Sequence, residues 1–342
     1  MCLVTRLLTV LGTVLSLLAV PAPASAAAPA GPRVPAGVTA GYVVFDRQTG
    51  KVTAHHDARR RFRSASVVKI LIAIDHLESH RAVPESDLAL LKVMLRVSDD
   101  DAATSFWNRG GQGRIIQRMA RRLQLTDTAP PPADKPGFWG YTSLSALDVV
   151  KTYRYLLDRA EPRVATLVLG HLRKAGQCGS DGFDQYFGIP RAVRGPWAVK
   201  QGWSGYGSTP PVRCRPAASP AAAAPDPRGT AASSPGAAPA TGAGKAAAAA
   251  GAVGAARPDG SEAAAAGGRT TSPTAAGAAP VSAGAGPVPD LGRPVLHTTG
   301  LVGPGERRIM VLLTAYPAGT SWQRSTAQMT RLAREVYLSG TS

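Results

Sequence analysis

Residues 66–80 read SVVKILIAIDHLESH, in which a serine and a lysine three residues apart open an apolar stretch. Apolar side chains recur through it at helical spacing: Val67, Ile70, Leu71, Ile74 and Leu77. The spacing predicts a helix, and residues three apart share one side of a helix, which brings the amine of Lys69 toward the hydroxyl of Ser66. A serine needs a base beside it to act as a nucleophile, and a desolvated lysine can be that base. Ser-x-x-Lys also arises by chance, so the pair needs support from elsewhere in the chain.

That support comes from three short motifs in a fixed order. Ser98-Asp99-Asp100 follows the pair and directly precedes a predicted helix. Lys200-Gln201-Gly202-Trp203 lies in a strand-like run, and His297-Thr298-Thr299-Gly300 lies in the next one. This order resembles that of the penicillin-recognising serine hydrolases, and most closely the class A β-lactamase branch. The resemblance covers about residues 38–340, apart from the segment 216–290.

The resemblance implies a role for each motif residue. Ser66 is expected to be the acylated nucleophile, Lys69 its proton acceptor, and Ser98 the group that passes the proton toward the leaving nitrogen. Lys200 is expected to supply positive charge to the serine and to a substrate carboxylate. The backbone N–H groups of Ser66 and Trp203 are expected to form the oxyanion hole, which usually matters most for acyl transfer. Substrate contacts are expected from the remaining positions: Asp100, Gln201, Gly202 and His297.

The sequence also departs from the family pattern. Asp100 replaces the usual asparagine, and an ionised carboxylate accepts hydrogen bonds without donating any. Gln201 replaces a threonine or serine whose hydroxyl contacts the substrate carboxylate. The loop that carries a glutamate in class A enzymes corresponds to Thr126–Tyr141, which is shortened, rich in proline and free of glutamate. Because that glutamate activates the water that removes the acyl group, we expect acylation with slow deacylation. Asp134, in the middle of this loop, is either a replacement base or a solvated residue.

The order of the other elements predicts an α+β fold. Strand-like runs at 41–46 and 51–56 predict a hairpin. Helical spacing then dominates at 66–80, 86–97, 101–109, 112–124, 143–158 and 162–174, with Asp99 and Asp101 expected to cap one of these helices. Strand character returns at 197–203, 294–302 and 308–316 before a last amphipathic helix at 321–338. We therefore expect an antiparallel five-stranded sheet flanked by helices, beside a helical lobe.

Three segments are expected to lie outside this fold. Residues 1–26 have the pattern of a cleavable signal peptide, with cleavage after Ala26, although an uncleaved anchor is the alternative. Residues 27–37 are expected to be a disordered tail. In the segment 216–290, Ala, Gly and Pro supply 53 of 75 residues, which predicts a disordered insert between two strands of the sheet. Removing the signal peptide and the insert leaves 241 residues, which suit one serine hydrolase domain, 38–342, preceded by the tail and interrupted by the insert.

The cysteines and histidines predict no metal site and no cofactor. Cys2 precedes the apolar run of the signal, whereas the lipid-bearing cysteine of a lipoprotein follows that run. Cys178 and Cys214 remain after export, and in an oxidising exterior an isolated pair predicts a disulfide. His76 and His80 are four apart on a predicted helix but lack the glutamate of the zinc-protease pattern, so we expect them to be packed or solvated. The aromatic residues Trp139, Trp203 and Tyr206 either line the site or pack in the core.

The formal net charge of +17 bears on the partners of the protein. No nucleic-acid-binding motif accompanies this charge, so anionic cell-wall polymers or membrane surfaces are expected before nucleic acid. Two functions stay open. One is a secreted, monomeric serine hydrolase that acts on β-lactam or D-alanyl-peptide-type amide bonds, as in peptidoglycan, through an acyl-Ser66 intermediate. The other is a catalytically degenerate member of the same fold that binds the cell wall.

Overall fold

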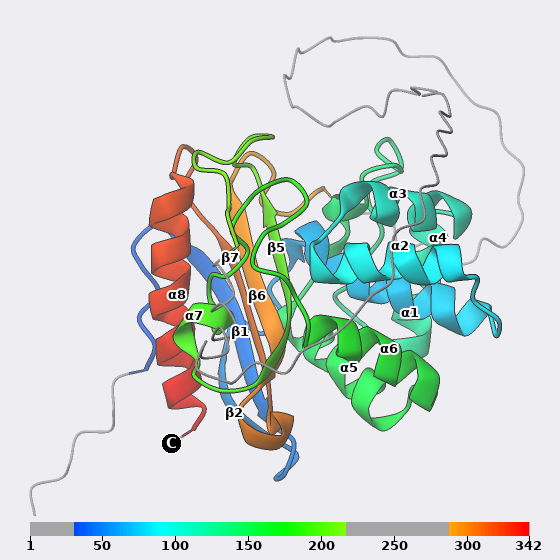
Figure 1. Cartoon of the computed structure of the whole chain (residues 1–342). Coiled ribbons are helices and arrows are strands. Elements are labelled where there is room, and N and C mark those ends of the chain that lie inside the picture. The colour runs from blue at the N-terminus through cyan, green and yellow to red at the C-terminus, as the bar shows by residue number, and fades with distance from the viewer. Residues whose placement is uncertain (1–30, 217–286, 342) are drawn as a thin grey trace, which may run out of the picture. The chain divides into compact units, whose positions relative to one another are not determined.

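The computed structural model describes residues 31–216 and 287–341. The signal peptide predicted for 1–26, the first residues of the predicted tail 27–37, and most of the predicted insert 216–290 lie outside these described residues. Five strands form one antiparallel sheet in the order β2-β1-β7-β6-β5 (Figure 1). Their bounds are Thr39–Asp46 for β1, Lys51–His56 for β2, Trp197–Ser204 for β5, Val295–Val302 for β6 and Arg308–Ala315 for β7. The predicted α+β class and five-stranded sheet are confirmed.

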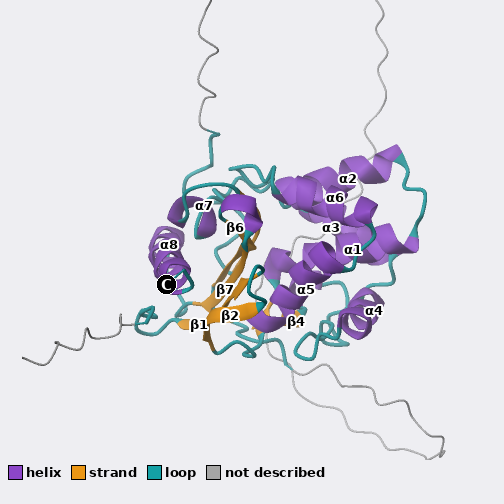
Figure 2. Cartoon of the chain, turned by 90° about the horizontal axis from the view of Figure 1, so that it is seen from below, coloured by secondary structure: helices purple, strands orange, loops and turns teal. Residues whose placement is uncertain are grey.

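Helices cover both faces of this sheet (Figure 2). On one face lie α7 (Ile189–Ala192) and α8 (Trp322–Ser339). On the other lies a helical lobe, whose members are α1 (Lys69–Ser79), α2 (Glu85–Arg96), α3 (Asp100–Arg109), α4 (Gly113–Leu123), α5 (Ala146–Asp158) and α6 (Pro162–Leu172). These helices match the predicted ones to within a few residues, except for α7, which the sequence did not predict.

The alternation of side chains along the strands explains why the sheet has two cores. Successive residues of a strand point to opposite faces. Val43 of β1 and Val311 of β7 join the core shared with the helical lobe, whereas Val44 and Leu312 join the core shared with α8. Since both faces are covered, nearly every residue of β7 is buried, which accounts for its continuous apolar sequence.

Local sequence signals fix where the lobe helices begin. The Asp99 carboxylate accepts a hydrogen bond from the Ala102 amide (2.8 Å) and caps α3, as expected. The Ser145 hydroxyl caps α5 in the same way by accepting from the Asp148 amide. Asp100 is the first residue of α3, so the cap at Asp99 fixes the backbone position from which the Asp100 side chain extends.

A second, two-stranded sheet was not anticipated. It pairs β3 (Phe62–Arg63) with β4 (Ser143–Leu144), and it adjoins two short 3₁₀ helices, η1 (Ala65–Val68) and η2 (Trp139–Tyr141). A third 3₁₀ helix, η3 (Pro304–Glu306), joins β6 to β7. Strands and helices this short give no periodic signal in a sequence. None of the helices in the described parts of the chain has the length and hydropathy that a membrane crossing requires.

Candidate active site

Ser66 lies in η1, just before α1 begins at Lys69. The Ser64 amide donates to the Thr142 carbonyl oxygen (2.7 Å), so η1 is anchored beside the β3–β4 pair. Ala65 has a φ of +44°, in the left-handed region that non-glycine residues seldom adopt. Backbone strain of this kind clusters at functional sites. Ser66 is 6% exposed, so only a small part of its surface is open to solvent.

Lys69 is fully buried at the start of α1. Its ammonium donates to the Ser98 carbonyl oxygen (2.6 Å), to Ser98 Oγ (3.3 Å) and to Asp100 Oδ1 (2.6 Å). Burial lowers the pKa of Lys69 from its ordinary value, and the nearby Asp100 carboxylate partly opposes that shift. A lysine with a lowered pKa is more readily neutral, which is the form that accepts a proton.

Ser98 joins the two buried lysines. It lies in the turn between α2 and α3 with a φ of +58°, a second left-handed residue at this site. Lys200, buried on β5, donates from its Nζ to Ser98 Oγ (2.8 Å). Burial and the charge of Lys69 both hold the pKa of Lys200 well below its ordinary value. Hydrogen bonds therefore join Lys69, Ser98, Asp100 and Lys200, and Ser66 lies three residues before Lys69. We call these five residues the catalytic cluster, after the roles that the family resemblance implies for them.

Gly202 explains how β5 comes so close to Ser66. A Cβ at this position would lie 3.2 Å from both the Ser64 carbonyl oxygen and the Ser66 amide nitrogen, so glycine allows the closest approach of the two backbones. The next residue along β5 is Trp203, whose backbone therefore lies near Ser66. This approach is the arrangement that the predicted oxyanion hole requires.

Two of the predicted substrate-binding side chains lie elsewhere. The Gln201 amide is buried and donates to the Gln185 and Phe187 carbonyl oxygens (3.0 and 2.6 Å). His297 is completely buried, with Nε2 at 2.8 Å from the Arg63 carbonyl oxygen and Nδ1 at 3.3 Å from the Thr314 amide. Because burial lowers the pKa of His297 to about 4, this ring is neutral near pH 7, with Nδ1 accepting and Nε2 donating. It supports β3, the strand that precedes Ser66 in the chain.

Comparisons with known proteins begin with sequence. No protein-family profile matches the chain. Proteins named "Putative lipoprotein LppW" from Mycobacterium tuberculosis and Mycobacterium bovis are each 37% identical to it over 175 residues, which is 49% of this chain and 54% of theirs. The chain thus spans about half the length of the curated relatives it matches.

Solved structures of other proteins can be superposed on most of this chain. PBP-A aligns with a TM-score of 0.52 at 13% identity, over 89% of this chain and 90% of PBP-A. A class A β-lactamase from Mycobacterium abscessus aligns with a TM-score of 0.51 at 14% identity, over 90% of this chain and 95% of the enzyme. The chain has the fold of the penicillin-recognising serine hydrolases. At such low identity the likeness establishes the fold, and the chemistry has to be argued from the residues of this chain.

Within this β-lactamase-like fold, Trp139 lies directly against the buried lysine. Lys69 Nζ is 4.6 Å from the centroid of the Trp139 ring, within the range of a cation–π contact. The indole Nε1 donates to Thr104 Oγ1 on α3 (3.2 Å), which fixes the ring. Trp139 comes from the loop that lacks the glutamate, so an aromatic face stands beside Lys69.

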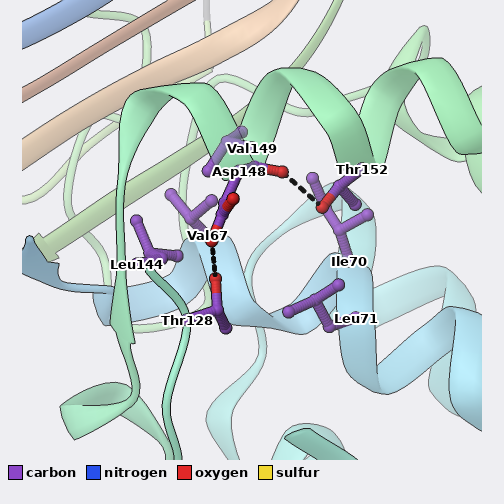
Figure 3. A pocket seen from close by; sticks show the side chains of 8 residues that line it. All are labelled: Val67, Ile70, Leu71, Thr128, Leu144, Asp148, Val149 and Thr152. Carbon is purple, nitrogen blue, oxygen red and sulfur yellow. Dashed lines mark hydrogen bonds between the residues drawn. The ribbon is translucent and has the colours of Figure 1, made fainter. Parts of the chain in front are cut away.

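A small cavity lies between the start of α1 and the start of α5 (Figure 3). It has a volume of about 10 Å³, which is about the space of one water molecule. Its lining includes Val67, Ile70 and Asp148, and the Asp148 carboxylate holds the start of the 126–141 loop by accepting from the Asp127 amide (2.7 Å) and from Thr128 Oγ1 (2.9 Å). The cavity is too small for a substrate, so it belongs to the support of the site.

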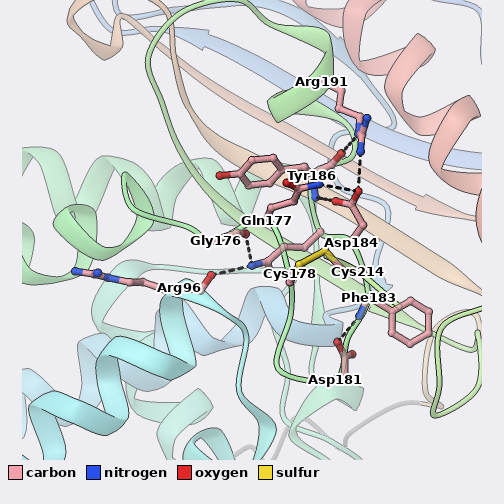
Figure 4. Close-up of a disulfide and its surroundings, with 11 residues drawn as sticks. Arg96, Gly176, Gln177, Cys178, Asp181, Phe183, Asp184, Tyr186, Arg191 and Cys214 are labelled. Atoms are coloured by element: carbon pink, nitrogen blue, oxygen red, sulfur yellow. Dashed lines mark hydrogen bonds and ion pairs between the residues drawn. A yellow bond between two sulfur atoms is a disulfide. The ribbon is translucent and has the colours of Figure 1, made fainter. Parts of the chain in front are cut away.

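The predicted disulfide is confirmed between Cys178 and Cys214, whose Cα atoms are 5.4 Å apart (Figure 4). Near it lies Asp181, a residue that the sequence did not single out, and its carboxylate accepts a hydrogen bond from the Trp203 indole (2.9 Å).

Across residues 31–216 and 287–341, no group of three or more His, Cys, Asp or Glu side chains is arranged to hold a metal ion.

Proposed function

We propose that the protein is an acyltransferase or hydrolase that forms an acyl ester on Ser66 from an amide of the β-lactam or D-alanyl-peptide type. The observation that carries the proposal is the placement of Ser98 Oγ between Lys69 and Lys200. Ser66 lies three residues before Lys69, and its backbone approaches β5 at Gly202. Two buried amines that share one hydroxyl disfavour being charged together, because like charges in a buried site repel. A neutral amine next to a serine is the requirement for activating that serine.

The reaction follows from these positions. Ser66 Oγ attacks the carbonyl carbon of the amide and gives its proton to neutral Lys69. The negative charge on the carbonyl oxygen is stabilised by the backbone N–H groups of Ser66 and Trp203. Ser98 then donates its proton to the leaving nitrogen as the C–N bond breaks, and Lys69 returns a proton to Ser98. An acyl ester on Ser66 and a free amine result, and each proton is accounted for.

Release of the acyl group is expected to be slow. Hydrolysis requires a base that takes a proton from water near the ester, and the loop 126–141 supplies no carboxylate beside Lys69. Asp127 is hydrogen bonded to Ser145 Oγ (2.9 Å), and Asp134 is exposed. The Trp139 ring instead covers one side of the Lys69 amine, and an aromatic face neither accepts a proton nor orients water for attack. The acyl-enzyme should therefore accumulate.

The proposal is tested by incubating the protein with a fluorescent penicillin and with its neutral ester, followed by peptide mass spectrometry. An adduct on Ser66 that disappears in Ser66→Ala is the expected result. Ser180→Ala, which removes an exposed serine near the site, is the control and should keep the adduct. If neither probe labels Ser66, the acyl-transfer proposal is wrong.

We also propose that the protein works in the cell envelope. The curated relatives are named as lipoproteins, and the chain begins with the pattern of an export signal. The alternative of a wall-binding protein without turnover is favoured by Asp100, whose contact with Lys69 stabilises the ammonium form of the base. Binding to purified cell wall that weakens steeply with salt, without any adduct on Ser66, would support this alternative.

A further inference from the structure

Asp181 is held at the junction between Ser98 and β5. The Ser180 amide donates to the carbonyl oxygen of Val97, the residue before Ser98 (2.8 Å), so the backbone beside Asp181 is bound to the Ser98 turn. On its other side, Asp181 Oδ2 accepts from the indole of Trp203, three residues after Lys200 (2.9 Å). Lys200 on β5 also reaches the Ser98 turn, through Ser98 Oγ (2.8 Å). The segment of Asp181 therefore contacts the same turn and the same strand that Lys200 joins.

The turn that presents Asp181 is closely constrained. The Gly179 amide donates to the Phe183 carbonyl oxygen (2.9 Å), and the Phe183 amide donates to Asp181 Oδ1 (3.1 Å). The disulfide fastens this turn to the segment that follows β5, and the Cys214 amide adds a hydrogen bond to the Gly182 carbonyl oxygen (2.7 Å). Both carboxylate oxygens are therefore fixed, yet the residue as a whole is exposed to solvent.

The ionisable side chains near Ser66 are two amines and two carboxylates, and the acyl transfer proposed above requires one of the amines to be neutral. Two lysines, Lys69 and Lys200, stand with two carboxylates, Asp100 and Asp181. Although the residue is partly exposed, desolvation of its carboxylate by the surrounding protein raises the pKa of Asp181, while the Phe183 amide and the Trp203 indole stabilise its ionised form. Gln201, next to Lys200, has turned its amide toward the Gln185 and Phe187 carbonyl oxygens, away from the catalytic cluster. A ligand carboxylate near Lys200 would meet the negative charge of Asp181 without help from the Gln201 donor.

Penicillins and D-alanyl-D-alanine peptides carry a carboxylate next to the scissile amide. We propose that Asp181 makes this site disfavour donors with that carboxylate, so that among amides of the β-lactam or D-alanyl-peptide type it prefers those that are uncharged or positively charged at this position. The inference rests on the acyl transfer to Ser66 proposed above and names its substrate class. A fixed carboxylate beside the oxyanion residue Trp203 disfavours an incoming anion and does not oppose an uncharged group. Asp181 is thus a specificity-determining residue, with no part in the proton transfers.

The test compares benzylpenicillin with its methyl ester, which differ in this one charge. In the wild-type protein, the ester should acylate Ser66 faster than the acid. In Asp181→Asn, which keeps an oxygen to accept from Trp203, acylation by the acid should rise, so the ester-to-acid rate ratio should fall about fivefold at low salt. The matched control is Asp101→Asn, which removes one exposed negative charge from α3 and should leave the ratio unchanged.

The outcomes separate the two proposals. If neither probe labels Ser66 in any variant, acyl transfer itself fails. If Ser66 is labelled and the wild type reacts faster with the acid, or if Asp181→Asn keeps the wild-type ratio, the role of Asp181 is wrong. Since the wild-type comparison needs no mutation, a poorly folded Asp181→Asn protein would still leave the inference open to refutation.

Discussion

The catalytic cluster and the two segments beside it differ in how far they follow the family resemblance. The cluster of Ser66, Lys69, Ser98, Asp100 and Lys200 is assembled from helix starts, the turn before α3 and the edge strand β5, and four of the five residue types are those the resemblance implies. The flanking segments, 126–141 and 176–187, place Trp139 against Lys69 and Asp181 against Trp203. Neither contact belongs to the motifs on which the family resemblance rests.

This difference separates two properties of an enzyme. Acyl transfer requires groups fixed to within fractions of an ångström, which buried helices and strands can provide. Turnover and substrate choice depend on what surrounds those groups, and loops can change there without disturbing the core. We infer that this chain keeps the means of acylation while the flanking segments change release and selectivity.

Of the substitutions considered, removing either buried lysine of the catalytic cluster should have the largest effect on the rate of acylation. Lys69→Ala and Lys200→Ala should each slow acylation of Ser66 by about 10³-fold, because general base and acid assistance contribute about 10²- to 10⁴-fold. Stopped-flow labelling measures the rate, and Lys92→Ala, at an exposed position on α2, is the control. A Lys69→Ala protein that acylates at the wild-type rate would show that another group is the base.

Breaking the disulfide should loosen one flanking segment while leaving the cluster in place. Cys178 and Cys214 are 36 residues apart, and removing a crosslink over such a loop costs about 2 to 4 kcal/mol of stability. Urea unfolding of the Cys178→Ser/Cys214→Ser double variant measures this loss. The ester-to-acid preference should fall as the Asp181 turn becomes mobile, with the ester rate nearly unchanged. Loss of both rates together would mean that the flanking segment also holds the cluster.

Replacing Trp139 addresses the other flanking segment. Trp139→Leu removes the aromatic face from Lys69 and should admit water, so that release of the acyl group becomes about tenfold faster, a change of about 1.4 kcal/mol in the barrier. Trp139→Phe keeps an aromatic face and should release slowly. The decay of the adduct in a chase without probe gives both rates. An unchanged decay in Trp139→Leu would remove Trp139 from the explanation of slow release.

Asp100→Asn should have the smallest effect, seen as a shift of the pH profile. Acylation needs neutral Lys69, so the rate should rise with pH through the pKa of this lysine. The Asp100 carboxylate raises that pKa against the effect of burial, so its removal should move the rising limb to lower pH. Asp101→Asn is the control, because Asp101 is exposed and makes no contact with Lys69 in the described structure. A limb that moves to higher pH would contradict the assignment of Lys69 as the base.

Much of the fold could be predicted because its signals are local. The apolar spacing from Val67 to Leu77 gave α1, and the run at 308–316 gave β7. The Ser-x-x-Lys pair, the Ser98 turn and the Lys200 strand were recognised by their order, and the structure brings them together. Strand alternation could have sharpened one expectation. Lys200 and Gly202 face the cluster, so Gln201 must point to the opposite face of β5, where it is found.

The contacts that change the chemistry could not be predicted in this way. Lys69 and Trp139 are 70 positions apart, and their contact depends on the η2 turn, which has no periodic signal. The contact between Asp181 and Trp203 depends on the position of the turn that carries Asp181. The disulfide and the hydrogen bond from the Ser180 amide to the Val97 carbonyl oxygen hold that turn in place. His297 was expected at the site, but it is buried against the backbone of Arg63. The β3–β4 pair, to which Arg63 belongs, is too short to be predicted from the sequence.

The most direct test of the account is a time course of intact-protein mass with the methyl ester of benzylpenicillin, followed by removal of the free ester. The account predicts one adduct per chain, mapped to Ser66, that forms readily and persists through many times its formation period. It also predicts no adduct in Ser66→Ala. Rapid return to the unmodified mass would show that the flanking segments do not block release. The absence of any adduct in the wild-type protein would show that the catalytic cluster does not perform acyl transfer.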